Sequence, residues 1–233
     1  MRKAIFALAV MAGVSAAVLA PAQDMLETVN VTGFRAESDP GAVPHVFLLH
    51  RADHLITKVT VICDTRDPGK RHAELKDTLR SMIREAARTG TISLGIGDEI
   101  VADLTEKMLD KVIVPDARQD TSRAEVIVKT RVNAADMFDD ATARIERFVE
   151  TTPKAGRTEV LRNKRWDLTI VGPEQYRAAV IAKVADDARK TAALIGPDTA
   201  IRIEGLQRPI AWYQKGPLDL ALYIPYTLTI QPK

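Results

Sequence analysis

The sequence contains one cysteine among 233 residues, and this scarcity excludes two kinds of protein. A single cysteine cannot form a disulfide within the chain, and it cannot build a zinc site from several thiolates. Glycine and proline number 12 each, which is too few for a collagen-like or low-complexity chain. Hydrophobic residues make up 46% of the sequence, so a chain of this length can bury a core without covalent cross-links.

Motifs of several common catalytic sites are also missing. The sequence has no G-x-S-x-G nucleophile elbow and no phosphate-binding P-loop. Gly95 and Gly97 lack the third glycine of a dinucleotide-binding loop, so they predict a turn at the end of a strand. We therefore expect no cofactor.

The first 22 residues have the pattern of a secretory signal peptide. Arg2 and Lys3 precede an unbroken run of apolar and small residues over 4–20, and Ala20-Pro21-Ala22 forms an A-x-A cleavage site. We expect cleavage after Ala22 and export to the periplasm of a Gram-negative-type envelope. A retained membrane anchor is the alternative, although the run is short for a spanning helix. No cysteine stands directly after the run, which excludes a lipoprotein anchor, and no transmembrane helix is expected after removal of the signal.

The predicted mature chain carries no net charge. Removal of residues 1–22 takes away two basic residues and no acidic one, so the 33 basic residues become 31 and equal the 31 acidic ones. Binding to nucleic acid depends largely on an excess of positive charge, so this balance gives no reason to expect a nucleic-acid partner.

Hydrophobic periodicity predicts both strands and helices. In the range 55–64, Leu55, Thr57, Val59, Val61 and Cys63 alternate with other residues, as in a half-buried strand. Similar patterns predict strands over 27–32, 91–96, 124–132, 166–170, 199–204 and 218–230. In the last range Pro225 argues for an edge position or a bulge.

Three amphipathic helices are expected. The first begins at Asp67 and Pro68 and ends at Gly90. The second follows Asn133 as its N-cap, and the third runs from Gly172-Pro173 to Gly196 and is expected to be the longest. Two pairs have the favourable i, i+4 order of charges, Asp140 with Arg144 and Asp186 with Lys190.

The order of these elements predicts an α+β fold, with largely antiparallel sheets and three long amphipathic helices packed on one face. After the signal at 1–22 we expect an irregular segment over 23–54 with one strand, and then a single α+β region over 55–233. A division of that region into lobes at about 55–120 and 121–233 is a further possibility. Residues 98–120 fit either helix or strand.

Several segments resemble the SIMPL (DUF541) family of exported bacterial envelope proteins. The segments that carry the resemblance are the strand V-T-V-I-C-D with the helix L-R-S-M-I-R-E-A-A-R-T-G, the strand and helix A-E-V-I-V-K-T-R-V-N-A-A-D-M-F-D-D-A, the element L-T-I-V-G-P-E, and the helix A-K-V-A-D-D-A-R-K-T-A. The resemblance covers about 55–231. The segment before Leu55 and the stretch 98–120 depart from the family pattern.

The resemblance implies a SIMPL-like fold, a periplasmic or envelope location, self-association in some members and links to envelope stress. It implies no catalytic residues. We therefore expect a non-enzymatic envelope protein that forms homo-oligomers or binds other envelope proteins. The alternative is a periplasmic hydrolase or ligand-binding protein with an unrecognised site.

Histidines and paired carboxylates are the candidate catalytic or metal-binding groups. His50 and His54 have i, i+4 spacing, which on a helix would bring two imidazoles together as weak metal ligands. Surface or core histidines are the other interpretation, and we expect no metal site. The neighbouring pairs Asp98-Glu99, Asp139-Asp140 and Asp186-Asp187 predict solvated acidic surface rather than acid–base pairs.

Three features are candidate contact sites. Cys63 predicts a small buried residue or, in an oxidising compartment, an intermolecular disulfide. A basic cluster suggests peripheral contact with anionic lipid or cell-wall polymer, against a solvated hairpin as the alternative; it comprises Lys154, Arg157, Arg162, Lys164 and Arg165. Trp212 and Tyr213 lie in a segment bounded by Pro209 and Pro217, where they predict either a partner contact or ordinary packing.

Overall fold

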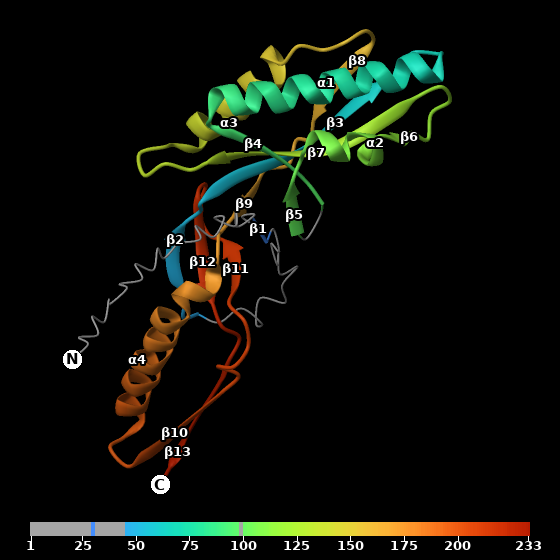
Figure 1. Cartoon of the computed structure of the whole chain (residues 1–233). Helices are drawn as coiled ribbons and strands as arrows, with labels where there is room; N and C mark the ends of the chain where they lie inside the picture. The colour runs from blue at the N-terminus through green and yellow to red at the C-terminus, as the bar shows by residue number, and fades with distance from the viewer. Residues whose placement is uncertain (1–28, 31–44, 98–99) are drawn as a thin grey trace, which may run out of the picture.

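The computed structural model describes residues 29–30, 45–97 and 100–233. The predicted signal peptide at 1–22 and most of the expected strand at 27–32 lie outside these residues. Figure 1 shows an upper part, which contains the largest sheet and the helices that precede residue 152, and a lower part that ends in a helix and a two-stranded sheet.

The elements follow one another from β1 to β13. The helices are α1 (Pro68–Thr89), α2 (Leu109–Val112), α3 (Phe138–Thr151) and α4 (Arg177–Ile195), with 3-10 turns at η1 (Glu106–Met108) and η2 (Pro173–Tyr176). The strands are β1 (Val29–Asn30), β2 (Leu48–Arg51), β3 (His54–Cys63), β4 (Ile92–Ile96), β5 (Ile100–Asp103), β6 (Val114–Pro115), β7 (Ser122–Arg131), β8 (Thr158–Arg162), β9 (Asp167–Thr169), β10 (Thr199–Glu204), β11 (Ala211–Gln214), β12 (Asp219–Tyr223) and β13 (Thr227–Pro232).

The large sheet has the order β1-β5-β4-β7-β3-β8, with β6 paired to β7 and β9 paired to β3, and every pairing is antiparallel. Its centre is the long ladder between β3 and β7. Val59, Val61 and Cys63 of β3 are buried on the face that α1 and α3 cover. The alternation predicted from the sequence therefore identified the core face of β3 correctly.

Helix α1 begins and ends where its capping residues predict. The Asp67 carboxylate accepts a hydrogen bond of 2.7 Å from the Lys70 N–H, and Gly90 ends the helix in the left-handed region at φ +65°. Leu75, Leu79 and Met82 are fully buried on its inner side. They join residues of β3, β7 and α3 in the larger of the two main core clusters.

Helix α3 begins later than the sequence predicted. Asn133 is not its N-cap; the helix starts at Phe138, and the Asp140 carboxylate accepts a hydrogen bond of 2.8 Å from the Met137 N–H. Arg144 pairs with Asp136, at 2.5 Å, rather than with Asp140. The reason is that Asp136 lies in the turn before the helix, where it also accepts a hydrogen bond from the Asn133 N–H.

A second sheet of three strands, in the order β11-β12-β2, lies below the large one. One face of it, with Trp212, Leu220 and Leu222, belongs to the second core cluster. That cluster also contains Leu55 of β3 and Leu168 of β9, so the two sheets are connected through packed apolar side chains. Neither β2 nor β11 was predicted from the sequence.

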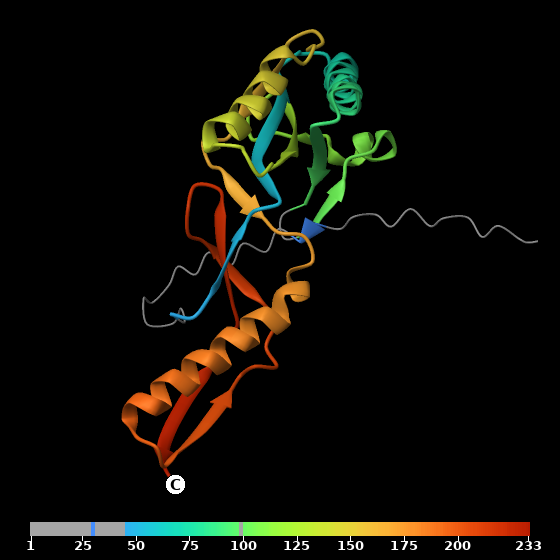
Figure 2. The ribbon, with the colours of Figure 1, turned by 90° about the vertical axis from the view of Figure 1, so that its left-hand side faces the viewer.

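The lower end of the molecule is an arm, which we define as α4, β10 and β13 (Figures 1 and 2). The single strand predicted over 218–230 is wrong, because β12 ends at Tyr223 and β13 begins at Thr227, with Pro225 between them. Strand β13 pairs with β10 in a two-stranded sheet. Helix α4 has 19 residues and is shorter than α1 with 22, so the third predicted helix is not the longest.

The α+β prediction is confirmed, but its finer description is not matched. The described residues contain four α-helices, and α4 contacts β10 in the arm instead of lying beside α1 and α3. A division at residue 120 does not match the packing, because β7 is central to the same sheet as β3 and β4. The stretch 100–120 contains both kinds of structure that its sequence allowed, with η1 and α2 between β5 and β6.

Candidate functional site

The two candidate metal ligands lie in two different strands. His50 is in β2 and His54 begins β3, so the helical spacing that would bring their imidazoles together does not exist. The His50 Nε2 atom lies 2.9 Å from the Tyr176 hydroxyl, and the two rings are in contact. His54 is buried. The described residues contain no group of three or more His, Cys, Asp or Glu side chains that could hold a metal ion.

The neighbouring carboxylates take part in separate local contacts. Asp140 caps α3, Asp186 pairs with Lys190 at 2.7 Å as the sequence predicted, and Asp187 lies 3.1 Å from His45 Nε2. Asp139 is exposed. Asp98 and Glu99 lie outside the described residues. Among the described pairs, Asp186 and Asp187 line the same hollow, but one contacts Lys190 and the other His45.

Cys63 is buried, with 1% of its surface exposed. Its thiol lies 3.2 Å from a Glu74 carboxylate oxygen, which also accepts hydrogen bonds from the Thr65 hydroxyl at 2.6 Å and the Arg157 N–H at 3.1 Å. The Thr65 hydrogen bond is the main cause that lowers the pKa of Glu74. A thiol in this position cannot reach a second chain, so the structure contradicts the intermolecular disulfide and supports the small buried residue.

Most charges of the basic cluster have partners within the protein. Arg157 pairs with Asp64 at 2.7 Å, and Arg165 pairs with Asp167 at 2.9 Å. Arg162 pairs with Glu146 at 3.1 Å and lies over the ring of Trp166. The Lys154 ammonium donates to three backbone carbonyls at the end of α3, where a cation is favourable. Lys164 is exposed. The arrangement favours a structural hairpin over a free basic patch.

Trp212 and Tyr213 lie in strand β11 and not in a loop. Trp212 is 6% exposed and belongs to the second core cluster, so it cannot form a partner contact. Tyr213 points to the opposite face, as consecutive strand residues do, and its ring packs edge-on against Phe47 and Tyr223. Of the two residues predicted as a contact pair, only Tyr213 is therefore partly at the surface.

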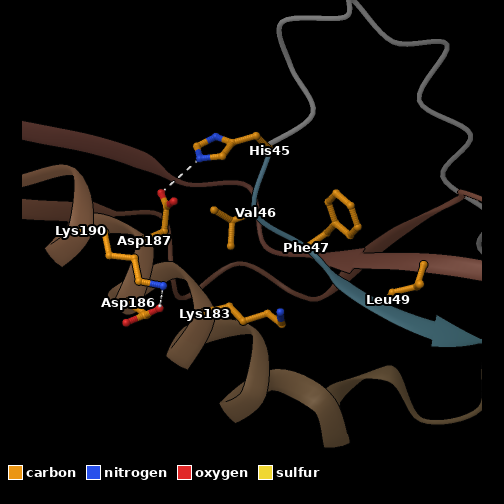
Figure 3. A pocket seen from close by; sticks show the side chains of 8 residues that line it. All are labelled: His45, Val46, Phe47, Leu49, Lys183, Asp186, Asp187 and Lys190. Carbon is orange, nitrogen blue, oxygen red and sulfur yellow. Dashed lines mark hydrogen bonds and ion pairs between the residues drawn. The ribbon is translucent and has the colours of Figure 1, made fainter. Parts of the chain in front are cut away.

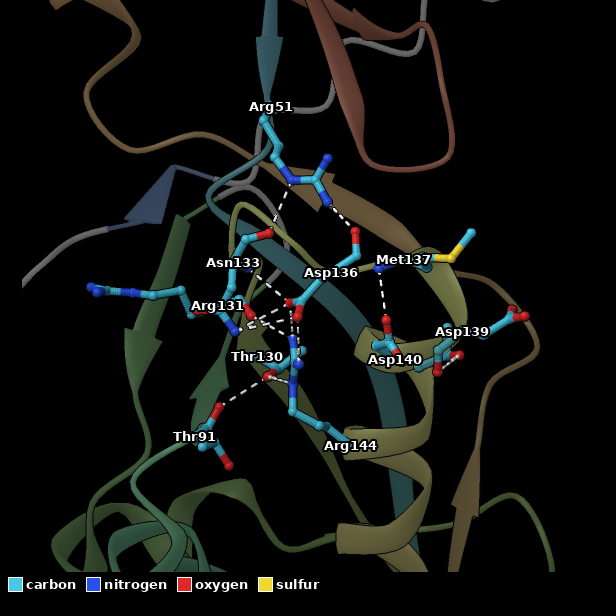
Figure 4. A network of polar contacts seen from close by, with 11 residues as sticks. Arg51, Thr91, Thr130, Arg131, Asn133, Asp136, Met137, Asp139, Asp140 and Arg144 are labelled. Atoms are coloured by element: carbon cyan, nitrogen blue, oxygen red, sulfur yellow. Dashed lines mark hydrogen bonds and ion pairs between the residues drawn. The ribbon is translucent and has the colours of Figure 1, made fainter.

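A network of polar contacts joins the two sheets (Figure 4). The Arg51 guanidinium, at the end of β2, donates to the backbone carbonyls of Asn133 and Asp136 in the turn before α3. The Arg144 guanidinium donates to the Asp136 carboxylate and to the Arg131 carbonyl at the end of β7. The hydrogen bond from Arg144 is the main cause that lowers the pKa of Asp136 to about 2.

A hollow of about 410 Å³ lies between α4 and the chain that leads into β2 (Figure 3). Four lining residues come from β2 and the segment that enters it, namely His45, Val46, Phe47 and Leu49, and four come from α4, namely Lys183, Asp186, Asp187 and Lys190. Leu49 is 57% exposed although it is a large apolar residue. The hollow therefore combines an apolar wall with a charged one.

Comparison with protein-family models, curated proteins and solved structures finds no match to this chain.

Sequence reasoning missed the hollow because it treated 23–54 as irregular. The run Val46-Phe47-Leu48-Leu49 between Pro44 and Arg51 was a usable signal, since four consecutive apolar residues after a proline are compatible with a strand. Nothing in the sequence pairs this run with α4, which begins 128 residues after Leu49. No helix of the described residues is long and apolar enough to cross a membrane.

Proposed function

We propose that this chain is a non-enzymatic protein of the bacterial envelope that associates with copies of itself through the arm. The observation that carries the proposal is a group of exposed apolar side chains at the end of the arm. Leu194 is 89% exposed, Ile195 60% and Ile201 40%. They are three of the seven large apolar residues that are exposed in the described part of the chain, and they lie within eight residues of one another.

The two-stranded sheet of the arm offers a second reason. Strands β10 and β13 pair only with each other among the described residues, so each has an open edge. Ile201 faces Ile230 across the ladder, and Ile203 faces Leu228, so the four apolar side chains share one face, on which Ile201 is exposed and the other three are half-buried. Open strand edges favour pairing with another chain. A second copy would cover both features.

The absence of a catalytic role in this proposal rests on what the polar groups do. The candidate carboxylates cap a helix, pair with lysine on the same helix or contact a histidine. The hollow beside α4 contains His45 and Asp187 but is not lined by serine, threonine or cysteine, the usual nucleophiles of a hydrolase. Carboxylates engaged in this way support a role in binding rather than in hydrolysis.

The envelope location rests on the basic and apolar pattern of residues 1–22 and on the resemblance to SIMPL proteins. Expression of the full chain in a Gram-negative host, followed by cell fractionation and mass spectrometry of the N-terminus, tests it. We expect a periplasmic protein that begins at Gln23. Cytoplasmic protein, or exported protein that retains Met1, would contradict cleavage and the assigned location.

Light scattering after size-exclusion chromatography tests self-association. We expect the exported protein to have a molar mass above that of one chain. A variant with Leu194→Glu and Ile195→Glu should shift it to a monomer, because buried carboxylates without partners oppose association. Leu161→Glu is the matched control, since Leu161 is a 49% exposed leucine outside the arm and should leave the mass unchanged. A wild-type monomer at high concentration would refute the proposal.

A ligand-binding protein is the second candidate, and the hollow between α4 and β2 favours it. Its volume of about 410 Å³ lies within the usual range for binding sites, and its walls are both apolar and charged.

A further inference from the structure

Strand β2 forms one edge of the three-stranded sheet. The sheet has the order β11-β12-β2, and among the described residues β2 pairs only with β12. An edge strand has a row of backbone N–H and C=O groups that can pair with another extended chain. The availability of these groups depends on the register of the β2–β12 ladder.

The register shows which backbone groups point outward. The Ala52 N–H donates to the Leu218 carbonyl at 2.9 Å, which continues the antiparallel ladder one residue beyond β2. In such a ladder, hydrogen-bonded and non-hydrogen-bonded pairs alternate. Leu48 and His50 therefore bond to β12, while the backbone groups of Leu49 and Arg51 point away from it. No described residue bonds to these outward groups of Leu49 and Arg51.

The hollow runs along this edge. Its lining includes Leu49 of β2 together with His45, Val46 and Phe47, which lead into the strand. The hollow therefore lies along the start of the edge strand and the chain before it. Helix α4 forms the opposite wall (Figure 3). A groove between an edge strand and a helix suits a short extended segment, which would add one strand to the sheet.

The charges in the groove define the partner further. Lys190 pairs with Asp186 at 2.7 Å and His45 lies 3.1 Å from Asp187, so each carboxylate already has a partner. Lys183 is exposed and makes no ion pair with any described residue. The Lys183 ammonium thus has no ion-pair partner among the described residues, and it lines the same hollow as Leu49 and Phe47. A carboxylate next to an apolar side chain is the complementary pattern.

We propose that the groove between β2 and α4 binds an extended segment of a partner protein by β-strand addition, with an apolar side chain on Leu49 and a carboxylate side chain at Lys183. A segment of about four to six residues matches the length of β2. Backbone hydrogen bonds to Leu49 and Arg51 would give affinity, and the two side-chain contacts would give selectivity. The proposal concerns a surface separate from the end of the arm and does not depend on self-association.

Fluorescence anisotropy with a labelled peptide tests whether the groove binds an extended segment. The probe is the peptide Thr-Val-Asp-Val-Thr-Val with blocked ends. A peptide with Lys in place of Asp is the charge-reversed control. We expect saturable binding of the Asp peptide to the full exported protein and at least about tenfold weaker binding of the Lys peptide. Two further probes carry N-methyl groups on one or the other alternate set of residues. One of them should lose binding, because it lacks the N–H donors that face β2.

Two variants of the protein complete the test. Lys183→Glu should reduce affinity for the Asp peptide about tenfold and favour the Lys peptide, while Lys107→Glu, at an exposed lysine on η1, should change neither. Leu49→Pro removes an outward N–H that the β2–β12 ladder does not use, so it should abolish binding with the sheet intact. Circular dichroism and thermal unfolding show whether both variants are folded. If Leu49→Pro is unfolded, Lys183→Glu still tests the proposal.

Four outcomes would overturn the proposal. They are the absence of saturable binding, undiminished binding of the Asp peptide by Lys183→Glu, undiminished binding of both N-methylated peptides, and preferred binding of a peptide copied from 227–232. The last would assign the groove to a second copy of the chain. The variant with Leu194→Glu and Ile195→Glu should still bind the Asp peptide. Failure of self-association with peptide binding retained would refute the proposed function alone, and the reverse result would refute this inference alone.

Discussion

Gly156 lies against the carboxylate of Glu74, so closely that a Cβ atom at position 156 would overlap the Glu74 side chain. The same carboxylate accepts a hydrogen bond from the Arg157 N–H and from the Thr65 hydroxyl. The backbone of Gly156 also has φ +54°, a conformation that favours glycine. Gly156 thus lets the loop after α3 approach α1 and the buried end of β3.

Gly156→Ala should lower the free energy of unfolding by about 2 to 3 kcal/mol, because it adds backbone strain and displaces Glu74. Gly90→Ala is the matched control. Gly90 has φ +65°, but nothing lies within 4 Å of a Cβ placed there, so strain alone should cost about 1 kcal/mol. Urea unfolding of both variants measures the difference. An equal decrease in the free energy of unfolding for both variants would show that the contact of Gly156 with Glu74 does not contribute to stability.

Protonation of Asp136, which breaks its ion pair with Arg144, should make the protein less stable in acid. The pKa of Asp136 is about 2 in the folded protein against 3.8 ordinarily, so its contribution is complete above the ordinary value and is lost as the pH falls from about 4 to 2. The side chain is 11% exposed, and the shift corresponds to about 2 kcal/mol. Thermal unfolding between pH 5 and pH 2 measures this loss.

Asp136→Asn should be less stable than the wild type at pH 6 and should show a smaller loss between pH 4 and pH 2. Asp139→Asn, at an exposed carboxylate in the first turn of α3, is the control and should follow the wild-type curve. An unaltered acid dependence in Asp136→Asn would mean that the pair does not contribute to stability.

Leu79→Ala should destabilise the protein by about 2 to 5 kcal/mol, because Leu79 is fully buried between α1 and the large sheet and its truncation leaves a cavity. The same change at Leu161, which is 49% exposed on β8, should cost less than about 1 kcal/mol. Chemical unfolding of the two variants compares the sites directly. Similar losses would contradict the assignment of the core face.

Cys63 should react slowly with a thiol reagent while the protein is folded, since only 1% of its surface is exposed. In a denaturant the reaction should become fast, because unfolding exposes the thiol and separates it from Glu74. Absorbance with a chromogenic disulfide reagent follows both reactions. Non-reducing electrophoresis of the native protein should show no disulfide-linked dimer, and a strong dimer band would contradict the buried position.

Prediction from the sequence succeeded where local signals agree with the tertiary structure. Asp67, Pro68 and Gly90 mark the ends of α1, and alternation marks the buried face of β3, because capping and periodicity act over a few residues. It failed where a residue's surroundings depend on more than its own helix or strand. Arg144 pairs with Asp136 in the turn before α3 and not with Asp140 on the helix, and Trp212 packs in a core cluster that includes Leu55 of β3.

Spacing and side-chain type alone specify the α+β class, the extent of α1 and the core face of β3. Local patterns leave open that the C-terminal strand breaks at Pro225, that α4 belongs to the arm, and that β2 lies beside α4. Each of these depends on contacts between segments up to about 140 residues apart, as in the pair of His45 with Asp187. Such contacts arise from packing of complete elements, which no short window of sequence specifies.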